Sequence, residues 1–292
     1  MNPVSVVIPA FEARAQIAAN LPVLLAELEQ RALGDEVILV DDGGDDGLDA
    51  WVSATHPPPA TFDSARADVR VVRRKKNAGF ARAALDGVRA AGHAHVLLLA
   101  PDVRVRAGFL HELCAALEDP IVAAASPRIV GADGRGLPRL VWRGGLLEIE
   151  LGEVDGPRDE PVDAAYAPWS ALLARRDELL AAGLDMRFAP GELADVDLSW
   201  TWKKAGRRVV TVPRSVVERT TPSNTTADDW AGVLDTRNRL LLTWKHLDAP
   251  ERRREHVEAL EARALDALLG GRKSELAAIV VALDTQTAIR GD

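Results

Sequence analysis

Short apolar stretches alternate with longer stretches of helical periodicity through the first 125 residues. The apolar stretches span residues 4–9, 36–40, 69–72, 95–99 and 121–125. Stretches of this length without polar alternation are typical of strands that are buried on both faces. Strands that alternate with helices in this way form a mostly parallel sheet with helices on both sides. The chain is therefore predicted to adopt an α/β fold.

The segments between these strands carry apolar residues three and four positions apart, as one face of a helix requires. Ile17, Leu21, Leu24 and Leu28 form such a stripe in the first of them. Further helices are predicted at 78–91, which is alanine-rich, and at 106–118, 175–182, 192–205 and from 227 onward. Further strands are predicted at 208–212 and at 146–151, the latter within the glycine- and proline-rich stretch 126–170.

Composition excludes several classes of protein. The net charge of −8 argues against sequence-independent binding to nucleic acid. Cys114 is the single cysteine, so the chain can form neither an intrachain disulfide nor a cysteine metal cluster. The first residues lack the basic segment of a signal peptide, and the apolar run 276–283 is too short to span a bilayer. We therefore expect a cytoplasmic protein, with the inner face of the membrane as an alternative location.

The loops that follow strands one, two and four are the predicted place of the chemistry. Ligands of open α/β sheets bind beyond the carboxyl ends of the strands, where the strand order reverses. These loops span residues 9–13, 41–47 and 100–104. The first of them lacks G-x-G-x-x-G, which argues against a dinucleotide-binding oxidoreductase. It also lacks a glycine-rich loop with a basic residue, which argues against a nucleotidyltransferase.

The second loop is rich in carboxylates. Asp41, Asp42, Asp45 and Asp46 follow a buried strand within six residues. A carboxylate at this place can accept hydrogen bonds from a ribose hydroxyl or a base N–H, and a solvated Asx turn is the alternative. Near 195 a second acidic pair begins a predicted helix, where carboxylates either favour the helix dipole or supply a general base.

In order and separation these segments resemble the inverting family-two glycosyltransferases of the GT-A fold. The resemblance rests on VSVVIPAFE, EVILVDDGGDDG, NAGFARAALDGVRAAG, VLLLAPDVRV and ADVDLSWTWKKAGRRVVTVPRS. A late element of the family is similar to RNRLLL at 237–242, so the resemblance covers roughly residues 3–245. It implies transfer of a hexosyl or deoxyhexosyl group from a nucleoside diphosphate sugar to an acceptor hydroxyl, with inversion.

The resemblance also implies domains and residue roles. A GT-A catalytic domain is expected at 1–226, with a nucleotide-binding half at about 1–125 and an acceptor half at about 126–226, before a helical extension at 227–292. By the same match, Asp42 contacts the uracil or ribose, Asp102 holds a cation on the diphosphate, and Asp195 is the base that deprotonates the acceptor. Asp197 points to another side of the helix and is expected either to cap it or to pair structurally. The full predicted substrate-binding set is Pro9, Phe11, Glu12, Asp41, Asp42, Arg74, Asn77, Gly79, Asp102, Trp169 and Arg219.

Several positions depart from the family pattern. Ala100 stands two residues before Asp102, where relatives carry Asp or Asn, and Ala194 stands in place of the glutamate before Asp195. Pro168 and Trp169 replace a small, glycine-containing element on the acceptor side. Arg219 falls where many relatives have a metal-binding histidine. The predicted Mg²⁺ or Mn²⁺ is therefore expected to bind weakly or to be dispensable, with Arg219 either replacing part of its charge or pointing to solvent.

Two further expectations concern partners. The acceptor is a glycan, a lipid-linked molecule or a small molecule, and the alternative function is a catalytically weakened GT-A domain that binds a nucleotide or glycan or acts as a scaffold. The C-terminal helices are expected to pack on the catalytic domain or to form a homodimer contact, with a membrane surface as the weaker alternative. The apolar stripes behind this expectation are Leu260, Leu265, Leu268, Leu269, Leu276, Ile279, Val280 and Leu283.

Overall fold

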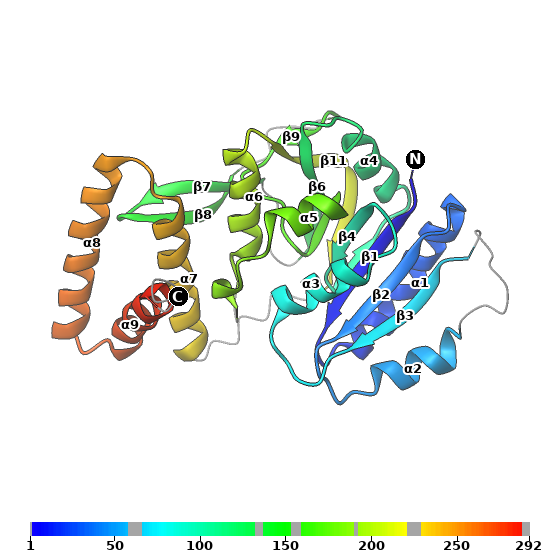
Figure 1. Cartoon of the computed structure of the whole chain (residues 1–292), viewed down its shortest axis with the longest axis horizontal. Helices are drawn as coiled ribbons and strands as arrows, with labels where there is room; N and C mark the ends of the chain where they lie inside the picture. Colours follow the sequence, from blue (N-terminus) through cyan, green and yellow to red (C-terminus); the bar gives the residue numbers. More distant parts are fainter. Residues whose placement is uncertain are drawn as a thin grey trace.

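The computed structural model describes residues 2–57, 66–131, 137–152, 159–189, 192–220 and 229–287. Within them a mostly parallel sheet forms the centre of the molecule, as the strand–helix alternation predicts (Figure 1). In spatial order its strands are β3 (Asp68–Arg73), β2 (Glu36–Asp41), β1 (Val4–Ala10), β4 (His95–Leu99), β10 (Ala171–Arg175), β6 (Val122–Gly131), β11 (Arg208–Arg219) and β5 (Val103–Val105). The short strand β9 (Val162–Asp163) pairs with β11.

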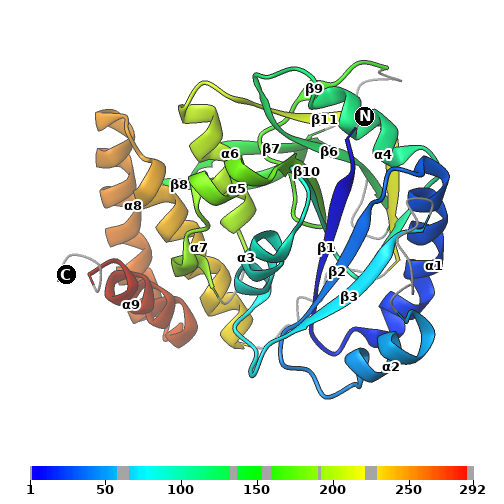
Figure 2. The same cartoon turned by 45° about the vertical axis from the view of Figure 1, so that its right-hand side comes forward.

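Helices cover both faces of this sheet (Figures 1 and 2). One face packs on α1 (Arg14–Arg31), α2 (Leu48–Thr55) and α4 (Phe109–Ala116), and the other packs on α3 (Phe80–Ala90), α5 (Arg176–Ala182) and α6 (Ala194–Lys204). Successive strand residues point to opposite faces, so Val6 and Ile8 of β1 join the first core while Val7 joins the second. Both faces being buried explains why the first strands read as continuous apolar runs.

The central strand β10 was not expected from the sequence. It lies between β4 and β6 and runs antiparallel to both. A run of only four apolar residues, 171–174, carries no periodicity from which a strand or its direction can be inferred. The direction has a consequence for the site, because Ala171 pairs with Leu99 and Ser170 accepts a hydrogen bond from the Ala100 amide. The segment before β10 therefore lies at the carboxyl end of β4.

The C-terminal helices form a separate group beside a hairpin (Figure 2). The helices are α7 (Asp229–His246), α8 (Pro250–Leu269) and α9 (Lys273–Thr287), and the hairpin is β7 (Leu137–Arg143) with β8 (Leu146–Gly152). Leu146 of the hairpin, Leu240 of α7 and Ile279 of α9 share a small apolar core. The helices thus pack on the β7–β8 hairpin, while the expected boundary after residue 226 lies outside the described residues.

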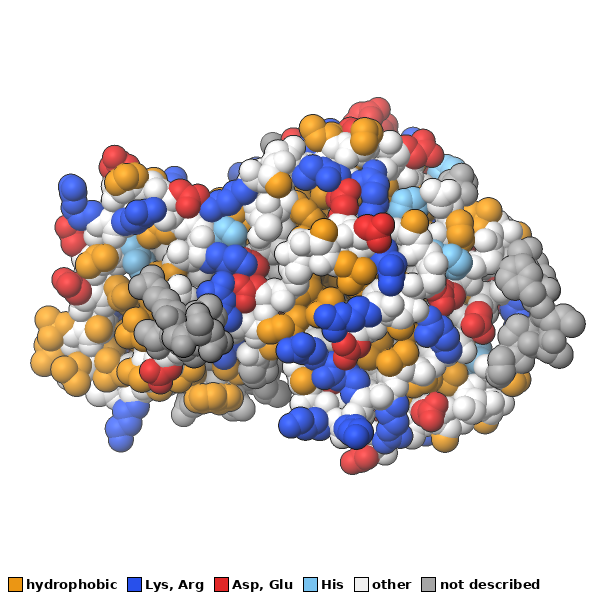
Figure 3. Space-filling view, viewed as in Figure 1, with side chains coloured by type: hydrophobic (Ala, Val, Ile, Leu, Met, Phe, Trp, Pro, Cys, Tyr) orange, Lys and Arg blue, Asp and Glu red, His pale blue; other side chains and the backbone are white. Residues whose placement is uncertain are grey.

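The expectation that water is excluded from the whole of both apolar stripes is wrong. Leu265, Leu268, Leu269, Val280 and Leu283 are exposed in this chain, Leu269 to 79%. The reason is that α9 packs mainly on α7 and α8 packs on α9, so that only one side of each stripe is covered, where Ala267 of α8 and Ile279 and Ala282 of α9 are buried. Hydrophobic side chains at the far end of α8 are visible in Figure 3. The homodimer contact stays a prediction.

None of the helices in the described part of the chain combines the length and the apolar character that crossing a membrane would require.

Candidate functional site

The loops after β1, β2 and β3 are bound to one another. Gly43 has a positive φ of 79°, and a Cβ there would lie 2.7 Å from the Lys76 backbone, so the β2 and β3 loops meet at a position that only glycine fits. Glu12, which has a positive φ of 51°, accepts a hydrogen bond from the Asp45 amide at 2.7 Å through Oε1. These contacts hold three loops at the carboxyl edge of the sheet.

Asp42 is buried and braces this edge. Its carboxylate accepts hydrogen bonds from the amides of Ala78 and Gly79, the latter at 2.8 Å, and lies 2.9 Å from Arg74 Nε. Burial raises the pKa of the Asp42 carboxyl, although the two amides and the guanidinium oppose this. Asp42 therefore connects the end of β2 to the start of α3 before any ligand binds.

The other predicted residues of this edge differ in accessibility. Asp41 is buried, and its Oδ1 accepts a hydrogen bond from the Gly44 amide at 2.8 Å. Arg74 bridges Asp42 and Asp86 in ion pairs. Pro9 is buried in β1 and Phe11 is 51% exposed, whereas Asn77 is exposed and accepts a hydrogen bond from the Gly79 amide at 2.9 Å.

Positive side chains gather at the same edge, although the chain as a whole is negative (Figure 3). Arg73, Lys75 and Lys76 at the end of β3 are exposed. Arg73 also donates a hydrogen bond to the Gly44 carbonyl at 3.2 Å. A local positive potential of this kind attracts an anionic ligand such as a diphosphate.

A cavity of about 390 Å³ lies beyond the carboxyl end of β4 and brings together four predicted residues that are distant in sequence. They are Asp102, Trp169, Asp195 and Arg219. The cavity does not include Asp41 or Asp42. Phe80 connects the cavity to the edge around Asp42. It lines the cavity and directly follows Gly79, whose amide donates a hydrogen bond to Asp42.

Asp195 belongs to the first turn of α6 and lines the cavity. Its Oδ2 accepts a hydrogen bond from the Trp169 amide at 3.2 Å, and its Oδ1 accepts one from the Val196 amide at 2.9 Å. Burial, together with the charge of Glu192, raises the pKa of the Asp195 carboxyl to about 6, against the opposing effect of these amides. A carboxylate with such a pKa is suited to accept a proton near neutral pH.

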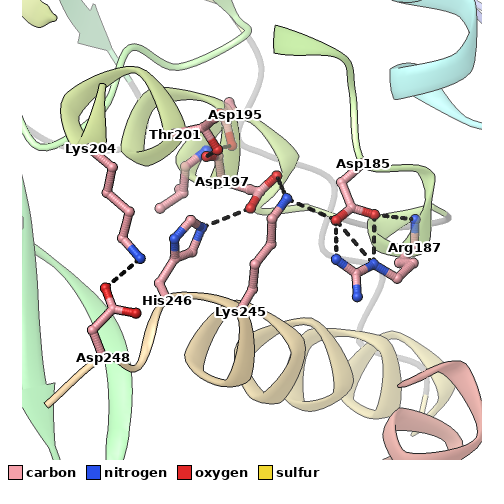
Figure 4. A network of polar contacts seen from close by, with 10 residues as sticks. Asp185, Arg187, Asp195, Asp197, Thr201, Lys204, Lys245, His246 and Asp248 are labelled. Carbon is pink, nitrogen blue, oxygen red and sulfur yellow. Dashed lines mark hydrogen bonds and ion pairs between the residues drawn. The ribbon is translucent and has the colours of Figure 1, made fainter. Parts of the chain in front are cut away.

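Asp197 faces away from the cavity, toward α7 (Figure 4). Its carboxylate lies 2.8 Å from Lys245 Nζ and 2.8 Å from His246 Nε2. Lys245 also contacts Asp185 at 2.9 Å, and Asp185 forms an ion pair with Arg187. Asp197 thus lies in a network that joins α6 to α7, which agrees with the structural pairing expected for it.

Asp102 and Arg219 form an ion pair, with 2.8 Å between Arg219 Nε and Asp102 Oδ2. β5 and β11 bring them together, because Val103 pairs with Arg219 in the antiparallel register. The backbone carbonyl of Asp102 also accepts hydrogen bonds from the amide and hydroxyl of Thr220. Arg219 therefore lines the cavity rather than pointing away from the site.

The residues around Asp102 do not fit a cation that protein side chains hold. A cation would compete with the Arg219 guanidinium for the same carboxylate, and Ala100 offers no side-chain oxygen. The described residues contain no group of three or more His, Cys, Asp or Glu side chains arranged to hold a metal ion. Hard cations bind several oxygen ligands, so this position is poorly suited to one.

The structure adds cavity residues that the sequence did not indicate. Phe80 stacks on Trp169 with ring centroids 5.5 Å apart, and Ile149 comes from the β7–β8 hairpin. Burial raises the pKa of the Tyr166 hydroxyl, as do the neighbouring carboxylates of Asp195 and Glu192. The position of Phe80 directly after Asn77-Ala78-Gly79, at the start of α3, was a usable signal, whereas nothing local indicated the others.

Comparison with known proteins places these observations in a family. Residues 5–176 match the model of Glycosyl transferase family 2. A curated relative, the pre-mycofactocin glycosyltransferase of Mycobacterium tuberculosis, is 30% identical over 185 residues, which are 63% of this chain and 37% of the relative. The chain therefore matches little more than a third of that protein's length.

Solved structures with low sequence identity share the fold. GalNAc-T7 with UDP, GalNAc and Mn²⁺ has a TM-score of 0.66 at 15% identity, over 83% of this chain and 48% of that one. The mannosyltransferase PcManGT of Pyrobaculum calidifontis, with GDP-Man and Mn²⁺, has a TM-score of 0.59 at 17% identity, over 98% and 88%. S. aureus TarS 1–349 with UDP-GlcNAc has a TM-score of 0.57 at 13% identity, over 97% and 89%.

Proposed function

This chain belongs to glycosyl transferase family 2, and we propose that it transfers a hexosyl or deoxyhexosyl group from a nucleoside diphosphate sugar to an acceptor hydroxyl, with inversion. One observation carries the proposal. The carboxylate of Asp195, with its pKa raised to about 6, lines the same cavity as the Arg219 guanidinium. A base and a fixed positive charge in one cavity are the two groups that an inverting transfer needs.

The reaction follows from these two groups. Asp195 removes the proton from the acceptor hydroxyl as its oxygen attacks the anomeric carbon. The bond from that carbon to the diphosphate oxygen breaks on the opposite face, and the diphosphate leaves with the electron pair. Arg219 meets the charge that develops on the diphosphate, since a guanidinium can bind phosphate oxygens with two N–H groups. Attack from the face opposite to the leaving group inverts the configuration.

The nucleoside part of the donor is assigned to the edge formed by the β1, β2 and β3 loops. Phe11 is exposed there, and the positive side chains of Lys75 and Lys76 favour the approach of the diphosphate. Gly79 and Phe80 lead from this edge into the cavity. A donor that spans the two places has its sugar beside Asp195.

Asp42→Ala is expected to weaken nucleoside diphosphate binding by about 1–3 kcal/mol, roughly 5- to 150-fold. The substitution removes the acceptor of the Ala78 and Gly79 amides and the ion-pair partner of Arg74. The loop before α3 then loses these attachments to the end of β2. Isothermal titration calorimetry measures the change. Asp49→Ala, on the exposed side of α2, is the matched control. Unchanged affinity in the Asp42 variant would contradict the assignment of this edge.

The acceptor is assigned to the aromatic side of the cavity. Phe80 and Trp169 form a stacked pair there, and Tyr166 and Ile149 complete an apolar wall. Such a wall fits the apolar face of a sugar ring or an apolar group next to the reacting hydroxyl, in a glycan, a lipid-linked molecule or a small molecule.

Trp169→Ala is expected to raise the KM for the acceptor about tenfold, with the KM for the donor within about twofold of the parent value. Asp195 keeps its hydrogen bond, because the Trp169 backbone amide donates it. Initial rates at varied acceptor and donor concentrations measure the two constants, and Trp51→Ala on α2 is the control for loss of an indole elsewhere. An equal rise in both constants would mean that Trp169 does not form the acceptor side.

A second candidate function is a catalytically weakened domain that binds a nucleotide or glycan. The observation that favours it is the ion pair between Asp102 and Arg219, which occupies the carboxylate assigned by family resemblance to the cation. The two functions differ in turnover. Release of nucleoside diphosphate from a donor in the presence of an acceptor supports the transferase, whereas donor binding without any release supports the second candidate.

A further inference from the structure

Two buried side chains of α7 hold the loop that leads into α6. Asn238 is fully buried, and its Nδ2 donates hydrogen bonds to the Phe188 carbonyl at 2.9 Å and to the Glu192 carbonyl at 2.8 Å. Arg237 is 6% exposed and donates from Nη2 to the same Phe188 carbonyl at 3.2 Å. It also donates from Nε to Asn238 Oδ1 at 2.9 Å. One amide side chain therefore connects both ends of the loop.

The backbone of this loop is strained where it enters α6. Leu193 is buried, lines the cavity and has φ 78° and ψ 0°, a left-handed conformation that a leucine rarely adopts. Its neighbour Glu192 provides one of the carbonyls that Asn238 binds. Strain of this kind persists only where surrounding contacts impose it. The Asn238 hydrogen bonds are such contacts, two residues before Ala194 begins the helix.

Helix α7 contacts α6 at a second point. Lys245 follows Asn238 by seven residues, two helical turns, so it lies on the same side of α7. Lys245 and His246 bind the Asp197 carboxylate, as Figure 4 shows. Asp195 lies between these two attachments, two residues from Leu193 and two from Asp197. Its place in the cavity is thus set from both sides by α7.

We infer that Asn238, supported by Arg237, is a positioning residue for the reaction: through the Phe188 and Glu192 carbonyls it holds the backbone that enters α6 at Leu193, so that Asp195 stays desolvated and aimed into the cavity. This inference rests on the proposed function of Asp195. It gives the C-terminal helices a part in the active site, in addition to their packing. Asn238 does not line the cavity, so its effect reaches the acceptor only through the loop.

The expected consequence is electrostatic as well as geometric. Burial is the main cause of the raised pKa of Asp195, and the charge of Glu192 adds to it. A loosened loop admits water and lets Glu192 move away, and both changes lower that pKa. A change that only destabilised the protein would leave the pKa of Asp195 in the folded molecules unaltered.

Asn238→Ser tests the inference. The shorter side chain cannot reach both the Phe188 and Glu192 carbonyls, and it adds no charge that would itself change the pKa of Asp195. We expect the NMR titration midpoint of the Asp195 carboxyl carbon to fall by about one pH unit or more from about 6. We also expect kcat to fall at least about tenfold, with nucleoside diphosphate affinity within about twofold of the parent.

Two further variants make the result decisive. Asn238→Ala, which also adds no charge, replaces the first variant if circular dichroism shows that Asn238→Ser does not fold. Arg239→Ala on the same helix, whose side chain pairs with Asp235, should leave the Asp195 midpoint and kcat unchanged. An unchanged midpoint in a folded Asn238 variant overturns the inference. A parent protein without turnover contradicts the proposed function instead, and the titration still decides whether Asn238 positions Asp195.

Discussion

Asp195→Asn is expected to reduce transfer by roughly 100- to 10,000-fold, the contribution of a positioned general base. Nucleoside diphosphate affinity should stay within about twofold, because the donor edge around Asp42 is a separate part of the site. Two effects on stability oppose each other at pH 7. The neutral amide removes the desolvation penalty of the carboxylate, but its single oxygen leaves the amide of either Trp169 or Val196 without an acceptor.

The pH dependence follows from the same carboxyl. Its folded pKa of about 6 lies above the ordinary 3.8, so Asp195 takes up its proton more readily in the folded protein and its contribution lowers stability as pH rises from about 4 to 6. Activity depends on the deprotonated form, so kcat/KM should rise with pH and reach half its plateau near 6. Rates from pH 4.5 to 8 measure this limb.

Glu192→Gln is the matched control for the pH profile. It removes a charge that raises the pKa of Asp195, so the acid limb should move to lower pH while the plateau is retained. Asp195→Asn should show no limb near 6 in its residual rate. A variant that keeps most of the parent turnover with a verified acceptor would exclude Asp195 as the base.

Arg219→Ala is expected to reduce kcat by roughly 100- to 1,000-fold, as the loss of a preorganised charge partner does. The guanidinium lines the cavity and lies 2.8 Å from the Asp102 carboxylate. Its removal deprives the leaving diphosphate of a fixed positive partner and leaves the negative charge of Asp102 without its ion pair. Initial rates at saturating donor measure the loss. Arg214→Ala, on the exposed side of β11, is the control.

Chelation distinguishes the contribution of the Arg219 guanidinium to turnover from that of a bound cation. We expect the parent protein to keep more than about a tenth of its turnover in excess chelator, because the residues around Asp102 offer few oxygen ligands. Arg219→Ala should be inactive under these conditions and should respond to added Mn²⁺ if the freed carboxylate then binds it. Complete loss of the parent's activity in chelator, together with an unaffected Arg219→Ala variant, would restore a metal-dependent reaction.

The sequence by itself determined the first half of the sheet and the edge where the candidate site lies. Continuous apolar runs identify buried strands, and the carboxyl ends of parallel strands meet at one edge, so the loops after β1, β2 and β4 could be placed together. The opposite orientation of Asp195 and Asp197 was also a local property, since residues two apart on a helix face different sides. Each of these inferences used neighbours within a few residues along the chain.

Only the tertiary structure decided how distant segments meet. The antiparallel direction of β10 brings Trp169 to the carboxyl end of β4, and the pairing of β5 with β11 joins Arg219 to Asp102 across 117 residues. The raised pKa of Asp195 depends on burial by its surroundings, and the support of its loop comes from Asn238 on a helix expected only to pack. Periodicity reports which face of an element is apolar, but not which partner covers that face, and for this reason the exposed leucines of α8 were also beyond its reach.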